Sequence, residues 1–329
     1  MDILKKIEQA KLVGRGGACF PVATKWNYVK KAEGNKYIVA NGAEGEPGVK
    51  KDGYILTHHT KEVINGINLA LKFFKAKRVF IFLNHNYTNA ESQIKKEIGK
   101  LPIEIIYKPQ NAGYIAGEES ALLSTLEKKR IEPSIRPPFP VESGYKQSPT
   151  LINNIETFYN ISLVDKNKFS DKRFYTVGGD CYKPGVYCLP DNWSIARILE
   201  ETNNFPRFKF FIQHGGRASG EVLNSTQLNQ KVRGCGAITI YKQDSHDSFN
   251  FIKNIINFYA ENSCGKCTPC REGSYRLKKM LSGTKMNWPH FLELIDNMEA
   301  SSFCALGSSL ALPVKSYLKN VNPDFNIQL

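Results

Sequence analysis

The spacing of apolar and polar residues divides the chain into three stretches. In the first, residues 1–165, helical patterns alternate with short continuous apolar runs. Apolar residues that recur every three or four positions predict helices over 60–72 and 89–100. The runs predicted to be strands are 37–40, 78–83 and 103–107. Because continuous apolar runs are typical of parallel strands buried on both faces, this stretch predicts an α/β domain whose parallel sheet is covered by helices.

The second stretch, residues 166–244, has short alternating runs separated by turn residues. The runs 174–177 and 185–188 flank a Lys-Pro-Gly turn and predict a hairpin, followed by a helix over 194–201 and a strand over 207–212. This pattern predicts a small α+β module. The third stretch, residues 245–329, predicts a helical bundle, because four segments carry an apolar face at helical spacing. These segments are 249–259, 271–281, 290–298 and 308–318.

Composition narrows the class of protein. The chain has 329 residues, 41% of them hydrophobic and 23% charged, which is ordinary for a folded, water-soluble protein. The longest apolar runs are far shorter than the roughly 18 to 20 residues of a membrane-spanning helix. The N-terminal residues are charged where a signal peptide would be apolar, so we expect a cytoplasmic protein. In that reducing compartment, the eight cysteines favour metal ligation over disulfides.

The formal net charge of +14 raises the question of a nucleic-acid partner. However, the lysine pairs are spread along the chain with no recognition motif beside them, so we expect no nucleic-acid binding. We interpret them as a solvated surface, with attraction of an acidic partner as the alternative. The pairs begin at Lys30, Lys50, Lys95 and Lys128.

The cysteine spacing is the most specific chemical signal. Cys264, Cys267 and Cys270 are separated by two residues each, and Cys304 follows at a distance. Three closely spaced thiolates and one distant thiolate are typical of four-cysteine ligation of an iron–sulfur cluster. Structural zinc is the rival interpretation, although zinc sites usually take their cysteines from separated pairs.

A glycine-rich loop near the N-terminus predicts an anion site. Glycines at 14, 16 and 17 allow backbone N–H groups to approach a phosphate, and Arg15 and Lys25 add positive charge. The loop fits neither the Walker pattern nor the dinucleotide-binding GxGxxG pattern, and a plain turn is the alternative interpretation.

Four further segments carry polar or stacking groups, and each has a simple structural explanation when taken alone. The loop 41–48 holds Asn41, Glu44 and Glu46 directly after a predicted strand, and is otherwise a solvated acidic turn. The stretch 113–122 begins a helix and carries adjacent acids, which a helix N-terminus stabilises. The proline-rich segment 136–140 presents Phe139 for stacking, and 149–157 sets two asparagines near a helix start.

Taken together and in this order, these segments resemble the flavin-containing NADH-binding subunit of respiratory complex I, the NADH:quinone oxidoreductase. They also resemble its relatives in soluble NAD-linked hydrogenases and formate dehydrogenases. The resemblance covers nearly the whole chain. It implies a Rossmann-like FMN- and NADH-binding domain over 1–165, a β-grasp (ubiquitin-like) module over 166–244, and a helical bundle over 245–329 that holds one [4Fe-4S] cluster.

The resemblance also implies roles for individual residues. The flavin-binding positions are Gly14, Arg15, Gly16, Gly17, Lys25, Asn41, Glu44, Tyr114, Gly117, Asn153 and Asn154. The positions around NADH are Phe20, Glu46, Glu118, Glu119 and Phe139. The cluster ligands are Cys264, Cys267, Cys270 and Cys304. Glu46 is the candidate catalytic residue, and the two adjacent acids favour NADH over NADPH because a carboxylate repels a 2′-phosphate.

The predicted reaction follows from electron counting. NADH releases two electrons as a hydride, a cluster accepts one at a time, and a flavin can do both. The resemblance implies a thioredoxin-like [2Fe-2S] subunit and further iron–sulfur electron-transfer subunits as partners. We therefore expect a cytoplasmic NADH dehydrogenase without direct membrane insertion, either free or held on the inner face of a membrane through those partners.

Two alternatives remain open. One is the flavin subunit of a soluble hydrogenase, a formate dehydrogenase or an electron-bifurcating complex. The other is a scaffold that keeps the cluster without flavin. The second arises because Cys19 and Ala43 stand where the family commonly has a glycine and an aspartate.

Overall fold

The computed structural model describes residues 2–245, 247–283 and 286–322, so the predicted range 245–329 extends partly beyond them. The chain forms two compact units. The first consists of Met1–Gly45 and Lys50–Phe174, and the second of Glu46–Val49 and Tyr175–Leu329. The loop after the first strand therefore leaves the first unit at Glu46 and returns to it at Lys50.

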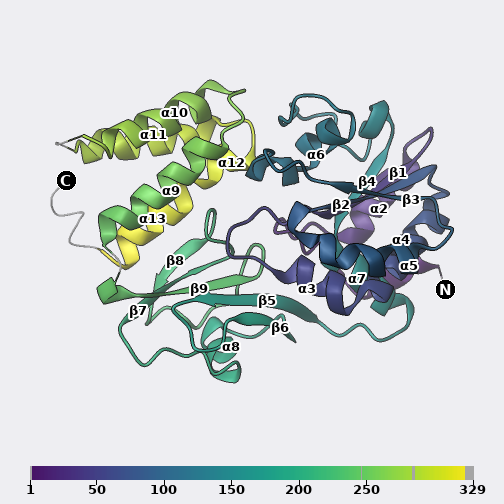
Figure 1. The fold of residues 1–329 in the computed structure, drawn as a ribbon, viewed down its shortest axis with the longest axis horizontal. Helices are drawn as coiled ribbons and strands as arrows, with labels where there is room; N and C mark the ends of the chain where they lie inside the picture. Colours follow the sequence, from purple (N-terminus) through teal and green to yellow (C-terminus); the bar gives the residue numbers. More distant parts are fainter. Residues whose placement is uncertain (1, 246, 284–285, 323–329) are drawn as a thin grey trace. The chain divides into compact units, whose positions relative to one another are not determined.

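The first unit is built on a parallel sheet with the strand order β3-β2-β1-β4 (Figure 1). The strands are β1 (Tyr37–Gly42), β2 (Arg78–Leu83), β3 (Ile103–Tyr107) and β4 (Thr150–Asn154). Strand β1 lies between β2 and β4. Its residue Tyr37 is opposite Arg78 of β2 and Thr150 of β4. The carboxyl ends of all four strands therefore point to the same edge, where ligands bind in sheets of this kind.

Helices and short 3-10 turns connect these strands. The elements are α1 (Ile3–Gln9), α2 (Val22–Lys31), α3 (Lys51–His58), α4 (Thr60–Phe74), η1 (His85–Ala90), α5 (Glu91–Ile98), η2 (Tyr114–Gly117), α6 (Glu119–Leu126), η3 (Tyr145–Gln147) and α7 (Ile155–Asp165). Helices α4 and α7 pack on each other and on β1. They approach so closely that a side chain at Gly66 would collide with the carbonyl oxygen of Phe158. A separate core lies between the sheet and α6, around Val39, Phe82 and Leu122.

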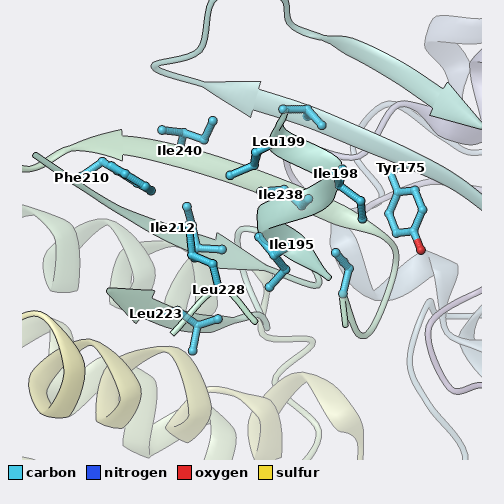
Figure 2. Close-up of a cluster of buried hydrophobic side chains, with 12 residues drawn as sticks. Tyr175, Ile195, Ile198, Leu199, Phe210, Ile212, Leu223, Leu228, Ile238 and Ile240 are labelled. Atoms are coloured by element: carbon cyan, nitrogen blue, oxygen red, sulfur yellow. The ribbon is translucent and has the colours of Figure 1, made fainter. Parts of the chain in front are cut away.

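The second unit contains a mixed sheet with the order β6-β5-β9-β7-β8. Its strands are β5 (Lys172–Gly179), which begins in the last residues of the first unit, β6 (Gly185–Pro190), β7 (Phe210–His214), β8 (Glu221–Asn224) and β9 (Ala237–Lys242). Strand β5 runs parallel to β9, and β7 runs antiparallel to both of its neighbours. Helix α8 (Ile195–Glu201) contributes Ile195, Ile198 and Leu199 to the core on this sheet (Figure 2).

The C-terminal part of this unit is helical. It contains η4 (Gln243–Ser245), α9 (Ser248–Asn262), α10 (Thr268–Met280), α11 (Trp288–Ser301), α12 (Ala305–Ser309) and α13 (Ala311–Asn320). Helix α13 is anchored to β8, because Asn320 Nδ2 donates to Val222 O at 2.7 Å. Helix α10 packs between α9 and α11, and a Cβ atom at Gly273 would stand 2.6 Å from Met298 Sδ. In the described residues, no helix combines the length and the apolar character that a membrane span needs.

Comparison with the sequence-based elements confirms a parallel α/β sheet and a helical C-terminal region, and the stretch predicted to be a small α+β module contains the mixed sheet and α8. The predicted strands 37–40, 78–83 and 103–107 correspond to β1, β2 and β3. Strands β4, β8 and β9 were not predicted. Strand β4 is a short run that leads directly into α7. The segment 308–318 is not one helix, because the chain leaves α12 at Ser309 and begins α13 at Ala311.

Candidate functional site

Five segments that the sequence singled out converge at the carboxyl ends of β1 and β4. Because these strands pair in parallel, Asn41 lies opposite Asn154. The Nδ2 group of Asn154 donates to Asn41 O at 3.3 Å, and Asn41 Nδ2 donates to Gly117 O at 2.9 Å. These bonds join the loop 41–48, the stretch 113–122 and the asparagine pair.

The glycines of this region allow close approach of the segments. A Cβ atom at Gly16 would stand 3.3 Å from Asn154 Cβ, and one at Gly45 would stand 3.2 Å from Tyr114 O. The loop itself is closed by Gly14, whose N–H donates to Phe20 O at 2.9 Å. The Arg15 N–H also donates within the fold, to Thr157 Oγ1 at 3.0 Å. The glycine-rich loop therefore lies at the sheet edge beside Asn154, a position that suits a phosphate-bearing flavin.

The two cations predicted to bind phosphate already face carboxylates. Arg15 is buried, and its Nη2 lies 3.4 Å from Asp171 Oδ1. Lys25 Nζ lies 2.7 Å from Glu119 Oε1 and donates to Ile152 O at 3.0 Å. The Lys25–Glu119 pair brings a predicted flavin residue and a predicted NADH residue into direct contact.

Asn153 differs from its neighbour Asn154 in being turned inward. Its side chain is 6% exposed, and its amide is satisfied within the fold. It donates to Ile152 O at 3.0 Å and accepts from Trp26 Nε1 at 3.3 Å. The structure therefore gives Asn153 a role in holding β4 against α2.

The adjacent acids form an ion-pair cluster with Arg136. Glu118 caps α6, because its Oε2 accepts from the N–H groups of Ser120 and Ala121 at 3.0 Å each. Its other oxygen pairs with Arg136 Nη2, which also lies 3.7 Å from Glu119 Oε2. Arg136 was not assigned a role from the sequence. Its position could have indicated a role, because Arg136 is a cation at the start of the proline-rich segment that presents the Phe139 ring.

Two aromatic rings that the sequence assigned to NADH are exposed to solvent. The exposed fraction of the side chain is 43% for Phe20 and 48% for Phe139. The guanidinium of Arg136 lies 5.8 Å from the centre of the Phe139 ring. Exposed aromatic rings are suited to stacking against the base of a nucleotide.

A buried ionic network below the asparagine pair was missed by the sequence analysis. The prediction that Lys50 and Lys51 both lie on a solvated surface is wrong for Lys51, which is 2% exposed. Its Nζ lies 2.7 Å from Asp52 Oδ1 and 3.1 Å from Glu156 Oε2, and donates to Asn154 Oδ1 at 3.0 Å. Although burial alone would lower the pKa of Lys51, these carboxylates raise it above its usual range. The network therefore fixes the orientation of Asn154 at the sheet edge.

Glu44 is directed towards this network. Its two oxygens accept from the N–H groups of Asp52 at 2.7 Å and Gly53 at 3.2 Å, and one also accepts from the Tyr87 hydroxyl. Burial, reinforced by the Asp52 carboxylate, raises the pKa of Glu44 to about 7. Because it accepts from the N–H groups of Asp52 and Gly53, Glu44 caps the first turn of α3. The sequence did not predict this capping role.

This raised pKa predicts a pH dependence of stability. Between pH about 4.5 and about 7 the folded chain keeps a proton on Glu44 that the unfolded chain loses, so the free energy of unfolding falls as the pH rises through this window. We expect Glu44→Gln to flatten that fall. Urea unfolding at pH 5, 6, 7 and 8 measures it, and parallel pH profiles for the two proteins would contradict the assignment.

Glu46 belongs to the second unit and is held by the turn after β7. Its Oε1 accepts from the N–H groups of Ala218 at 2.8 Å and Ser219 at 3.3 Å, and its Oε2 accepts from Ser219 Oγ at 3.3 Å. A side chain at Gly216, where φ is +153°, would collide with this carboxylate. Glu46 is therefore a buried carboxylate with a fixed orientation.

The four predicted cluster cysteines gather around the start of two helices. Cys267 is the N-cap residue of α10 and Cys304 that of α12. Cys267 and Cys270 are 6% and 4% exposed, while Cys264 is partly exposed. A Cβ atom at Gly307 would stand 3.1 Å from Cys270 Cβ, which places α12 against the three-cysteine loop.

The electrostatics of Cys270 reflect this clustering. Burial raises its pKa to about 11, and the charges of Cys267, Cys304 and Cys264 add to the effect. Each cysteine of a cubane binds a different iron, so these ligands stand further apart than those that share one ion. In the described part of the chain, no three His, Cys, Asp or Glu side chains are arranged to hold a single metal ion. The donor set fits an iron–sulfur cluster, whose positive irons would stabilise the four thiolates.

A glycine-rich loop at the edge of a parallel sheet, combined with a four-cysteine helical region, is typical of proteins that bind a flavin and an iron–sulfur cluster. Comparisons with known proteins agree. Residues 7–163 match the Nuo51 FMN-binding domain, and residues 250–328 match the NADH-ubiquinone oxidoreductase-F iron–sulfur binding region.

Similar proteins cover the chain almost completely. An NADH-quinone oxidoreductase F subunit of Rhizobium meliloti, designated F 2, is 30% identical over 98% of this chain and 88% of its own length. The alpha subunit of the NAD-reducing hydrogenase HoxS of Cupriavidus necator is 28% identical over 97% of this chain and 59% of its own length. A crystal structure of an NAD+-reducing [NiFe]-hydrogenase superposes with a TM-score of 0.91 at 28% identity. That match covers 99% of this chain and 62% of the hydrogenase chain.

The chain belongs to the family of NADH-quinone oxidoreductase F subunits, which has relatives among NAD-reducing hydrogenases. This confirms the predicted class, an NADH dehydrogenase subunit with an FMN-binding domain and a 4Fe-4S binding region.

Proposed function

We propose that this protein takes hydride from NADH in its first unit and delivers single electrons through a [4Fe-4S] cluster in its second unit to partner subunits. The observation that carries the proposal is that one chain combines an FMN-binding domain with an iron–sulfur binding region. When bound, FMN supplies the conversion from two-electron to one-electron transfer.

The residues at the edge of the first sheet have proposed binding roles. The glycine loop would hold the flavin phosphate through its backbone N–H groups, with Arg15 and Lys25 adding positive charge. Asn41 and Asn154 would contact the flavin from the carboxyl ends of β1 and β4, and Tyr114 would contact it from η2. The inward position of Asn153 supports an indirect role, in which it holds β4 in place.

NADH would be recognised by the acids and the exposed rings. Glu118 and Glu119 accept hydrogen bonds and are held by Lys25 and Arg136, so they suit a ribose with free hydroxyl groups. A 2′-phosphate would meet two carboxylates, which supports NADH over NADPH. Phe20 and Phe139 would stack against the adenine.

Glu46 is the proposed catalytic residue. Loss of hydride leaves a positive charge on the nicotinamide, and a carboxylate of fixed orientation stabilises that charge without rearrangement. Because a glutamine side chain keeps the shape without the charge, Glu46→Gln is expected to lower turnover of NADH with ferricyanide by about 100-fold. Stopped-flow and steady-state rates test this, with Glu33→Gln, an exposed carboxylate variant outside the proposed site, as the control. Unchanged kinetics in Glu46→Gln would remove Glu46 from the reaction.

The domain limits, partners and location are also proposals. We assign residues 1–165 to flavin and NADH binding, 166–244 to a β-grasp module and 245–329 to the cluster-binding bundle. The mixed sheet with helix α8 packed on one of its faces supports the β-grasp assignment. A thioredoxin-like [2Fe-2S] subunit and further iron–sulfur subunits would accept the electrons, and would hold the protein on the cytoplasmic face of a membrane in a respiratory complex.

The similarity to the NAD+-reducing hydrogenase favours a second candidate function. In that case the same electron path would serve a soluble hydrogenase, and the flow between NADH and the cluster could run in reverse.

A further inference from the structure

Tyr259 lies at the centre of a hydrogen-bonded chain within the second unit. It is fully buried in α9. Its hydroxyl donates to Ala218 O at 3.2 Å and shares a hydrogen bond of 2.9 Å with Ser309 Oγ. These two partners belong to the turn after β7 and to the end of α12, which are far apart in the sequence.

One arm of this chain leads to Glu46. The same Ala218 whose carbonyl accepts from Tyr259 donates its N–H to Glu46 Oε1 at 2.8 Å. A single residue therefore separates the tyrosine hydroxyl from the carboxylate. Any movement of Ala218 that follows from loss of the hydroxyl is transmitted to Glu46.

The other arm leads to the cluster-binding cysteines. Ser309 is the last residue of α12, whose N-cap residue is Cys304. The same helix lies against Cys270, because a Cβ atom at Gly307 would stand 3.1 Å from Cys270 Cβ. Burial raises the pKa of Tyr259 above its usual range, and the charges of Glu46 and Cys270 add to the effect. The hydroxyl is therefore electrostatically close to both groups and stays protonated.

We propose that Tyr259 is a positioning residue that couples the Glu46 carboxylate to the iron–sulfur cluster by holding the turn at Ala218 and helix α12 in one hydrogen-bonded chain. The inference rests on the proposed function, because it requires a cluster at the four cysteines. Hydrogen bonds and polar groups around a cluster set its reduction potential, since the reduced form carries more negative charge.

The test is the midpoint potential of the cluster in the full chain, measured by an anaerobic redox titration followed by electron paramagnetic resonance. In Tyr259→Phe the ring is kept and the hydroxyl is lost, so we expect a more negative potential. Ser309→Ala, which removes only the α12 arm, should shift the potential in the same direction by less. Tyr175→Phe removes another buried tyrosine hydroxyl of this unit, one that donates to Pro190 O, away from the turn at Ala218, and should leave the potential unchanged.

A double-mutant cycle tests the coupling itself. Glu46→Gln removes a negative charge and should raise the potential, and the size of that shift should differ when Tyr259 is already replaced by phenylalanine. Equal shifts in the two backgrounds, or a Tyr259→Phe potential equal to that of Tyr175→Phe, would overturn the inference while leaving the proposed function intact. A wild-type protein that binds no cluster would overturn both, and Ser309→Ala provides the same comparison if Tyr259→Phe does not fold.

Discussion

Replacing Cys267 with alanine is expected to abolish the brown iron–sulfur chromophore and to reduce the bound iron to background. Cys267 is 6% exposed and is the N-cap residue of α10, where the helix N-terminus favours a thiolate. A four-cysteine cluster that loses one buried ligand has no replacement for it among the motif cysteines. The measurement is iron and sulfide content together with the visible spectrum of protein purified without oxygen.

The matched control is Cys188→Ala. Cys188 is an exposed cysteine in β6, outside the cluster motif, and its loss should leave the iron content at the wild-type level. If Cys267→Ala keeps its colour and iron, the four-cysteine assignment is wrong. If the wild-type protein holds one zinc ion per chain in place of iron and sulfide, the rival zinc interpretation is correct.

The second large effect is expected from Lys51→Met. This change removes the cation that faces Asp52 and Glu156 in the interior of the first unit. Because two buried carboxylates would lose their partner, the free energy of unfolding should fall by about 3 to 5 kcal/mol. The loss should be smaller at pH 5 than at pH 8, since burial already raises the pKa of Asp52 and protonation would relieve the uncompensated charge.

Urea unfolding of the flavin-loaded protein measures this effect, and flavin content provides a second readout, because Lys51 Nζ also holds Asn154. The control is Lys95→Met, which removes an exposed i,i+4 pair with Glu91 and should cost less than about 0.5 kcal/mol. Equal stability losses for the two variants would mean that the buried network does not hold the sheet edge.

The sequence predicts the glycine and cysteine motifs of this protein better than it predicts which charged side chains are buried and what they contact. Glycine spacing and cysteine spacing are local patterns, so the glycine-rich loop and the four cysteines could be singled out from the residues alone. Strands β1, β2 and β3 are continuous apolar runs and were predicted for the same reason. Strand β4 was not, because this short strand ends in two asparagines, the second of which caps α7.

The charged residues show why the remainder could not be predicted. A lysine followed by an aspartate looks like solvated surface, and only long-range packing places Glu156, from the distant helix α7, against Lys51. The same holds for Glu46, whose partners Ala218 and Ser219 come from a distant turn. Partners of buried charges depend on tertiary contacts that leave no periodic signal in the sequence.

The most direct test of the electron-entry function is a spectral titration of the protein, purified without oxygen, with NADH and then with NADPH. The account predicts resolved flavin bands on a broad iron–sulfur absorbance, with the flavin bands bleached by NADH and much less by NADPH. Iron–sulfur absorbance without flavin bands and without any response to NADH would contradict it, and would identify the chain as a scaffold for the cluster.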